Sequence, residues 1–155
     1  MDGNIGNTVY SKHLKIECTD ENWITVRNFV NLFIEEISAD MYVPPNFLVA
    51  CEEIYINISR YAHTCGPNIV DIQCSYTYGL QQICVEFIDS GIEFDPTKLN
   101  LNNEILPLEK REPGGLGILI AKKMSDFMCY RRVNSKNILK LFKKIEKKRS
   151  ANNGE

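Results

Sequence analysis

The chain has 155 residues, of which 44% are hydrophobic and 25% charged, and its formal net charge is −2. This composition is typical of one globular domain, and a chain of this length can bury an ordinary core without disulfide or metal staples. The slight acidity argues against a general nucleic-acid-binding protein, because such proteins usually carry a basic excess. No apolar run reaches membrane-spanning length and the first residues show no signal peptide pattern, so we expect no membrane contact and a cytoplasmic location.

The first part of the sequence predicts a strand followed by two helices. Polar and apolar side chains alternate over residues 9–19, as in a half-buried strand. Thr19 or Asp20 can then cap a helix, in which apolar side chains recur at helical spacing: Trp23, Val26, Phe29, Val30, Phe33 and Ile34. A double proline at 44–45 suits the start of a second helix. Its apolar stripe consists of Phe47, Leu48, Cys51, Ile54, Tyr55, Ile58 and Tyr61.

The middle of the sequence changes to a period of two. Alternation over residues 70–78 and again over residues 83–89, with a glycine turn between them, predicts an antiparallel hairpin. Glycine and proline then interrupt residues 90–117, which show no convincing periodicity. A loop of this length within a compact domain is usually functional or mobile.

The remaining elements complete one domain. Residues 116–127 predict a helix, and residues 129–142 predict a last hairpin whose turn includes Asn137. The order of the elements predicts an α+β fold, namely a two-layer sandwich in which helices cover one face of a mainly antiparallel, mixed sheet. We assign the domain to residues 1–145 and expect residues 146–155 to form a disordered tail.

Six cysteines raise the question of disulfides. Cys51, Cys74 and Cys84 occupy apolar positions of the predicted helix and strands, as small core residues do. No two cysteines have the CxxC spacing of a zinc site or a redox motif. Because no secretion signal is visible either, we predict reduced, structural thiols.

Glu53 and Asn57 lie four residues apart and therefore share one face of the predicted second helix. They fall at the border of its apolar stripe, where polar groups can face a pocket. A carboxylate there can act as a general base, and an amide oxygen is a suitable ligand for Mg²⁺. The alternative is a solvated glutamate and asparagine on a helix flank, which is the commoner explanation of such a pair when it stands alone.

Asp89 closes a predicted strand and is followed, two residues later, by Gly91. A carboxylate at a strand end can accept a hydrogen bond from an exocyclic amine such as that of adenine. The glycine would let the backbone approach the ligand without a Cβ atom in the way. The alternative is that the aspartate and the glycine only form a turn.

A third cluster, Gly114, Gly115, Leu116 and Gly117, precedes a predicted apolar helix. Free backbone N–H groups in such a turn can wrap an anion, and the helix N-terminus adds a favourable dipole. The cluster is not a Walker A loop, since no Lys-Ser or Lys-Thr pair follows it. The flexible end of a loop is the alternative interpretation.

The order of the three clusters resembles the ATP-binding domain of sensor histidine kinases, gyrase-type topoisomerases, Hsp90-type chaperones and mismatch-repair ATPases, which has a Bergerat-type fold. Glu53-x-x-x-Asn57 is similar to the asparagine box of that superfamily. Asp89-x-Gly91 is similar to its first glycine box. The glycine turn around residues 115–117 is similar to its second glycine box.

Within that superfamily, three stretches look most like those of the bacterial anti-sigma factor serine/threonine kinases, which are free-standing proteins of about this length. The stretches are residues 51–62, 89–96 and 111–118. The likeness covers nearly the whole chain. At Glu93 the chain departs from the family pattern, which often has a further glycine at this place.

The resemblance implies that the protein binds ATP with Mg²⁺ and transfers the γ-phosphoryl group to a serine or threonine of a STAS-type antagonist protein. Asn57 would hold Mg²⁺, and Asp89 would read adenine. Glu53 would take the proton of the acceptor hydroxyl, and Arg111 would offset charge on the terminal phosphate. Residues 97–113 would form a lid. The other nucleotide-binding residues would be Gly91, Gly114, Gly115, Leu116 and Gly117.

The sequence leaves partners and activity open. A sigma factor is a second partner that the resemblance implies, and family members commonly form homodimers. One alternative is a partner-switching module that binds ATP and sequesters a regulator with little or no catalysis, and the side chain of Glu93 keeps this alternative open. The other is an interaction protein that binds no nucleotide. Neither nucleic acid nor a membrane is expected as a partner.

Overall fold

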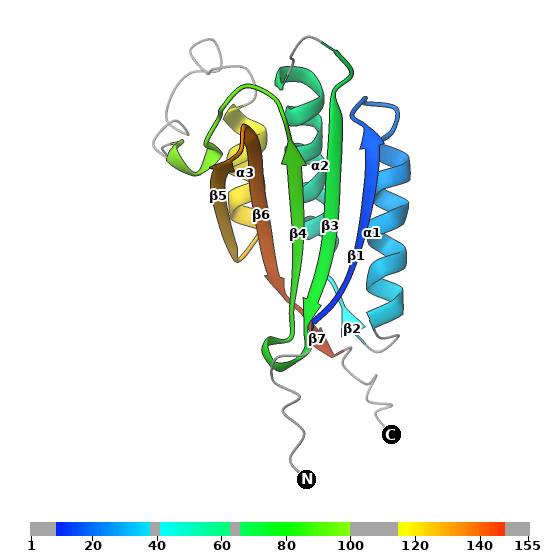
Figure 1. Cartoon of the computed structure of the whole chain (residues 1–155). Coiled ribbons are helices and arrows are strands. Elements are labelled where there is room, and N and C mark those ends of the chain that lie inside the picture. Colours follow the sequence, from blue (N-terminus) through cyan, green and yellow to red (C-terminus); the bar gives the residue numbers. More distant parts are fainter. Residues whose placement is uncertain (1–8, 38–40, 63–65, 100–114, 148–155) are drawn as a thin grey trace, which may run out of the picture.

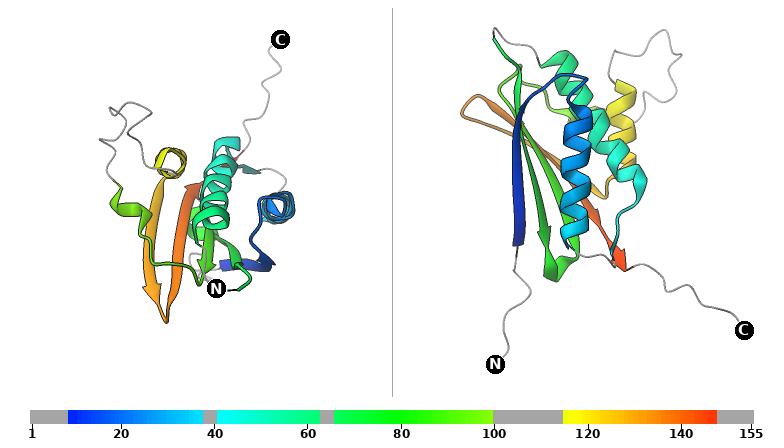
Figure 2. Two further views of the ribbon diagram at one scale, coloured as in Figure 1. Left: turned by 90° about the horizontal axis from the view of Figure 1, so that it is seen from above. Right: turned by 90° about the vertical axis from the view of Figure 1, so that its right-hand side faces the viewer.

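The computed structural model of the chain describes residues 9–37, 41–62, 66–99 and 115–147. These residues form a two-layer α+β sandwich, in which the helices lie on one face of a five-stranded sheet (Figures 1 and 2). The elements, with η for a short 3₁₀ turn, are β1 (Val9–Glu17), α1 (Trp23–Ile37), β2 (Met41–Tyr42), α2 (Pro45–Tyr61), β3 (Ile69–Thr77), η2 (Tyr78–Leu80), β4 (Gln82–Asp89), η3 (Pro96–Lys98), α3 (Gly115–Met124), β5 (Phe127–Val133), β6 (Lys136–Lys144) and β7 (Glu146–Lys147).

The main sheet has the strand order β1-β3-β4-β6-β5, and each of its four pairings is antiparallel. The prediction of an α+β sandwich with a mainly antiparallel sheet is therefore confirmed, and no parallel pair occurs among the described strands. In the view from above in Figure 2, α1, α2 and α3 all lie on the same side of this sheet. Its strands are amphipathic, because alternate side chains point toward the helices.

The two long helices begin where the sequence indicated. The backbone N–H of Asn22 donates to Oγ1 of Thr19 (3.3 Å) just before α1, as a capping side chain does. Helix α2 begins at Pro45, where the fixed φ of proline suits the first turn and its missing N–H is not needed. It ends at Tyr61, and the N–H of Ala62 closes the last turn on the carbonyl oxygen of Ile58.

The core lies between the helices and the covered face of the sheet. From the strands, the buried side chains of this face are Val70, Ile72, Cys74, Tyr76, Ile83, Val85, Phe87, Leu139 and Leu141. They pack against buried side chains of the helices, among them Val30, Phe33, Phe47, Ile54 and Tyr55. Full burial of one such large apolar side chain stabilises the fold by about 1.5–3 kcal/mol. Tyr78, expected to continue this face, is instead 40% exposed, because β3 ends at Thr77.

The C-terminal part differs from the prediction in three details. Helix α3 ends at Met124, so that Phe127 begins β5 instead of ending the helix. The last hairpin turns within two residues, Asn134 and Ser135, whose φ angles of 50° and 60° suit a type I′ turn. Asn137, expected in the turn, therefore belongs to β6.

The third difference concerns the predicted tail. Its first two residues form β7, which pairs antiparallel with β2. Order thus extends through residue 147, and residues 148–155 lie outside the described residues. None of the described helices combines the length and apolar character needed to cross a bilayer.

The cysteines give a test of the core. Within the described residues Cys18, Cys51, Cys74, Cys84 and Cys129 are all free thiols, and only Cys129 is not fully buried. Burial raises the pKa of Cys18, Cys74 and Cys84 to about 12, and that of Cys51 well above its usual value. Because the thiolate is the reactive form, these four should react slowly in the folded protein.

We therefore expect iodoacetamide at about pH 8 to modify the four buried cysteines at least ~100-fold more slowly in the native protein than in urea. Cys129 should be modified first among the described cysteines. Mass spectrometry of the alkylated peptides measures both rates, and the urea sample is the control. Fast native labelling of Cys74, or a stoichiometric disulfide between any two cysteines, would contradict this expectation.

Candidate functional site

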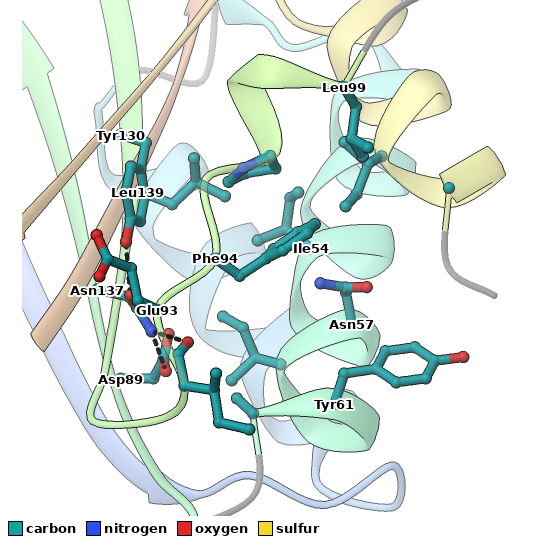
Figure 3. Close-up of a pocket in the computed structure, with 16 residues that line it drawn as sticks. Ile54, Asn57, Tyr61, Asp89, Glu93, Phe94, Leu99, Tyr130, Asn137 and Leu139 are labelled. Atoms are coloured by element: carbon teal, nitrogen blue, oxygen red, sulfur yellow. Dashed lines mark hydrogen bonds between the residues drawn. The ribbon is translucent and has the colours of Figure 1, made fainter. Parts of the chain in front are cut away.

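A cavity of about 300 Å³ opens between α2, α3 and the ends of β4, β5 and β6 (Figure 3). Its apolar wall consists of Ile54, Ile58, Ala62, Phe94, Pro96, Leu99, Ile118 and Leu139, together with the exposed rim residues Tyr61 and Ile92. The polar groups that line it are Asn57, Asp89, Glu93, Tyr130 and Asn137. An apolar cavity with a few convergent polar groups is the usual form of a small-molecule site.

Helix α2 supplies the floor of the cavity and the first predicted pair. Ile54 and Ile58 are buried on its core face, and Asn57 lies at the border of that face, half-buried and directed into the cavity. Glu53 lies one turn before Asn57, outside the cavity lining. Its carboxylate lies against Gly117, where an added Cβ atom would overlap Oε2 of Glu53. The helix therefore brings Glu53 to the first turn of α3 and Asn57 to the cavity.

Asp89 ends β4 at the inner end of the cavity and is only 5% exposed. Its Oδ1 accepts two hydrogen bonds, from the backbone N–H of Gly91 (2.8 Å) and from Nδ2 of Asn137 (3.0 Å). Both of these bonds use the same oxygen. Oδ2 is thus the oxygen of Asp89 that is left for a ligand in the cavity.

Gly91 has a packing role that its motif did not predict. It does not line the cavity, and an ideal Cβ atom at this position would lie 2.6 Å from both Cβ and the carbonyl oxygen of Ala62. The glycine lets the segment after β4 pack tightly against the end of α2. This close contact with Ala62 is by itself a reason for a glycine here.

Gly91→Ala should therefore destabilise the protein, by about 1–3 kcal/mol, because backbone atoms must move to admit the methyl group. Gly115→Ala is the matched control, since a Cβ atom at 115 meets nothing within 4 Å, and it should change stability by less than about 0.5 kcal/mol. Urea denaturation of both variants measures the difference. Equal stability of the two variants would show that Gly91 does not pack tightly against Ala62.

The predicted glycine cluster forms the start of α3. Gly115 lines the cavity, Gly117 faces Glu53, and Leu116 is 49% exposed and outside the cavity lining. Gly114 and Arg111 lie outside the described residues, as does the predicted lid from residue 100 onward. The structure thus places Gly115, Asn57 and Asp89 around one cavity, and adds Glu53 through its contact with Gly117.

Asn137 is a site residue that the sequence analysis assigned to a turn. It is 6% exposed, and its Oδ1 accepts from the hydroxyl of Tyr130 (2.7 Å) and from Nη1 of Arg132 (2.8 Å). Burial and the nearby charge of Glu93 raise the pKa of Tyr130, which keeps its hydroxyl protonated and able to donate. The signal in the sequence was the spacing of Asn137, Leu139 and Leu141, which stand at every second position. In a strand this spacing places Asn137 on the same covered face as the two leucines.

The segment after β4 is held from both sides. Asp95 caps η3 by accepting from the backbone N–H of Thr97 (2.9 Å). From α3, Nζ of Lys122 donates to the carbonyl oxygens of Thr97 (2.9 Å) and Leu99 (2.8 Å). These bonds fix the outer wall of the cavity, which includes Glu93, relative to α3.

Comparison with known proteins identifies this arrangement. A family model for the histidine kinase-like ATPase domain matches residues 16–143, which include α2, the end of β4 and α3. The chain belongs to the family of histidine kinase-like ATPase domains. Membership of this family implies that the chain binds ATP.

A solved structure supports the fold. It contains the RsbU and RsbW domains of Rv1364c from Mycobacterium tuberculosis, and this chain is similar to it with a TM-score of 0.54 at 12% sequence identity. The match covers 86% of this chain and 32% of that chain, so this chain spans about a third of it. At this identity the likeness shows the fold alone. No curated protein matches the chain.

Proposed function

We propose that the chain is an ATP-dependent serine/threonine kinase that phosphorylates a STAS-type antagonist of an anti-sigma factor in a partner-switching system. The observation that carries the proposal is the placement of Asp89. It is buried at the end of an apolar cavity with one carboxylate oxygen available, while the neighbouring helix carries Asn57 and Glu53. The family membership supports the nucleotide, and the resemblance of the three motifs supports the reaction.

The residues present fit an adenine base. Ile54, Ile118 and Leu139 offer apolar surface on which a flat ring can lie. Oδ2 of Asp89 can accept a hydrogen bond from the exocyclic amine at the inner end. A carboxylate is a strong acceptor in such a partly desolvated place, because the surroundings compete weakly for it.

The mouth of the cavity fits a magnesium-bound triphosphate. Asn57 would hold Mg²⁺ through its amide oxygen, since Mg²⁺ prefers oxygen ligands and keeps several waters. Gly115 leaves open space at the start of α3, where N–H groups without helical partners favour an anion. Gly114 and Arg111, which precede this helix in the sequence, would add an N–H donor and a positive charge.

Glu53 would act as the general base. Its carboxylate lies at the first turn of α3, beside the place where this proposal puts the terminal phosphate. A serine or threonine hydroxyl of a docked partner would meet Glu53 there, and Glu53 would take its proton as the bond to phosphorus forms. The mechanism needs no further protein nucleophile.

The test is transfer of label from ATP that carries it on the γ-phosphate. The purified chain is incubated with Mg²⁺, the labelled ATP and, one at a time, STAS-type proteins of the same organism. We expect one of them to be phosphorylated on a single serine or threonine. A thermal shift with Mg-ATP runs in parallel, since a ligand at ~100 times its dissociation constant adds about 2.7 kcal/mol of stability. A thermal shift without transfer to any STAS protein would refute the kinase, and no shift would refute ATP binding as well.

Glu93 favours one second candidate function. Its exposed carboxylate lines the cavity close to Asp89 and adds negative charge to a site for a polyanion. A module that binds ATP weakly and sequesters a regulator without catalysis would tolerate this charge. In either case a sigma factor and a second copy of the chain are the further partners we propose, and the cytoplasm is the proposed location.

A further inference from the structure

We infer that Asn137 is a positioning residue that sets the base specificity of the cavity. It holds one oxygen of Asp89 toward the ligand and keeps the donors of neighbouring side chains directed away from the cavity. The site therefore selects a purine with an exocyclic amine over one with an exocyclic carbonyl. The inference rests on the nucleotide binding of the proposed function. It goes beyond that function because Asn137 itself need not touch the nucleotide.

The orientation of the Asn137 amide follows from its partners. A guanidinium group can only donate, and Nη1 of Arg132 lies 2.8 Å from Oδ1 of Asn137, so this atom must be the oxygen. The amide nitrogen then faces two acceptors, Oδ1 of Asp89 (3.0 Å) and the carbonyl oxygen of Ile92 (2.9 Å). Both N–H groups of the amide are thereby committed to protein atoms.

This arrangement fixes the carboxylate of Asp89. Its Oδ1 receives the amide of Asn137 from β6 and the backbone N–H of Gly91 from the following segment. Two donors from different directions prevent the carboxylate from rotating without losing a hydrogen bond. Oδ2 is consequently held toward the cavity, and an ionised carboxylate oxygen can only accept.

The other described donors at this edge are also directed away from the ligand. The hydroxyl of Tyr130 donates to Oδ1 of Asn137 (2.7 Å), because an amide oxygen cannot donate to it. Nη1 of Arg132 also donates to the carbonyl oxygen of Gly91 (3.2 Å). Glu93, the remaining charged group that lines this wall, is an acceptor.

The part of the cavity wall that would face the base therefore presents acceptors. This suits an exocyclic amine of the base and opposes an exocyclic carbonyl oxygen. Adenine offers an N–H to Oδ2 of Asp89, whereas an inosine base would bring oxygen against oxygen. A base with neither group would lose the hydrogen bond without the repulsion. Such a loss at a buried charged partner weakens binding by about tenfold or more.

The experiment compares three magnesium-bound ligands by calorimetry: ATP, purine riboside triphosphate, which lacks the exocyclic amine, and inosine triphosphate. The wild type should prefer ATP to purine riboside triphosphate by about tenfold or more, and bind inosine triphosphate most weakly. Asn137→Ala should lower ATP affinity about tenfold and leave purine riboside triphosphate within about threefold, which removes the preference. Lys136→Ala is the control, because this exposed neighbour on β6 should leave all three affinities unchanged.

Asn137→Asp provides a second variant of the same shape. At about pH 8 it replaces the amide donor with an acceptor beside Asp89, so the preference for ATP should also be lost.

The outcomes separate the inference from the proposed function. An unchanged preference in Asn137→Ala or, at about pH 8, in Asn137→Asp would overturn the inference while ATP binding stands. So would an equal loss of affinity for ATP and purine riboside triphosphate, because that is the result of general damage to the cavity. No binding of any triphosphate by the wild type would overturn the proposed function as well.

Discussion

Glu53→Ala should reduce phosphorylation of the antagonist about 10²–10⁴-fold, while Mg-ATP affinity stays within about twofold of the wild type. The structure gives the reason for this separation. Glu53 lies outside the lining of the cavity, and its carboxylate contacts Gly117 at the first turn of α3. In the proposed function, a base at this place would act on the acceptor hydroxyl and would hold no part of the nucleotide. Phosphorylation rates with saturating ATP, together with calorimetry of Mg-ATP, measure the two effects.

Two further variants sharpen this prediction. Glu52→Ala, next to Glu53 on the same helix, removes an equal charge from outside the site and should keep the wild-type rate. Asn57→Ala should weaken Mg-ATP binding as well as turnover, since the proposed metal ligand is lost. A wild-type rate in Glu53→Ala would show that Glu53 is not the base. The non-catalytic alternative predicts instead that the wild type itself shows no turnover.

The fold was largely predictable from the sequence because its signals are local. The alternation along β3 and β4 and the helical stripe of α2 each depend on which residues recur within one element. The double proline and Thr19 fixed the starts of two helices through backbone chemistry that needs no tertiary contact. The short pair of β2 and β7 was not predictable, because two-residue strands carry no periodic signal.

The candidate site was predictable only where its residues carry a motif. Glu53, Asn57 and Asp89 were identified through their spacing and their places at element ends. Asn137 was missed because the prediction made the turn too long, although Asn134 and Ser135 complete it alone. A shorter turn moves Asn137 into β6 and onto the covered face, where it can reach Asp89.

The glycines show what a linear pattern cannot convey. Gly91 and Gly117 were both expected to make room for a ligand. In the structure Gly91 makes room for Ala62 and Gly117 for the carboxylate of Glu53. Each contact joins segments far apart in the chain, so the reason for the glycine appears only in the packed fold.

Asp89→Asn should lower ATP affinity about 30–150-fold and reverse the preference of the cavity toward inosine triphosphate. The backbone N–H of Gly91 and Nδ2 of Asn137 both donate to the inner oxygen of residue 89, so the new amide must keep its oxygen there. The nitrogen of the new amide is then turned toward the cavity. If adenine binds, the N–H of this amide would face the N–H of the exocyclic amine, and neither would have an acceptor. Loss of a hydrogen bond to a charged group, with a donor left unpaired, costs about 2–3 kcal/mol.

The carbonyl oxygen of inosine would accept a hydrogen bond from that amide, and its affinity should rise above that of ATP in this variant. Asp95→Asn is the matched control, because Asp95 caps η3 from outside the cavity lining and its oxygen can still accept from the N–H of Thr97. It should leave both affinities near those of the wild type. Calorimetry with the two nucleotides decides the matter. If Asp89→Asn binds ATP as tightly as the wild type, Asp89 does not read the base. An amide donor placed opposite the adenine amine would otherwise weaken binding.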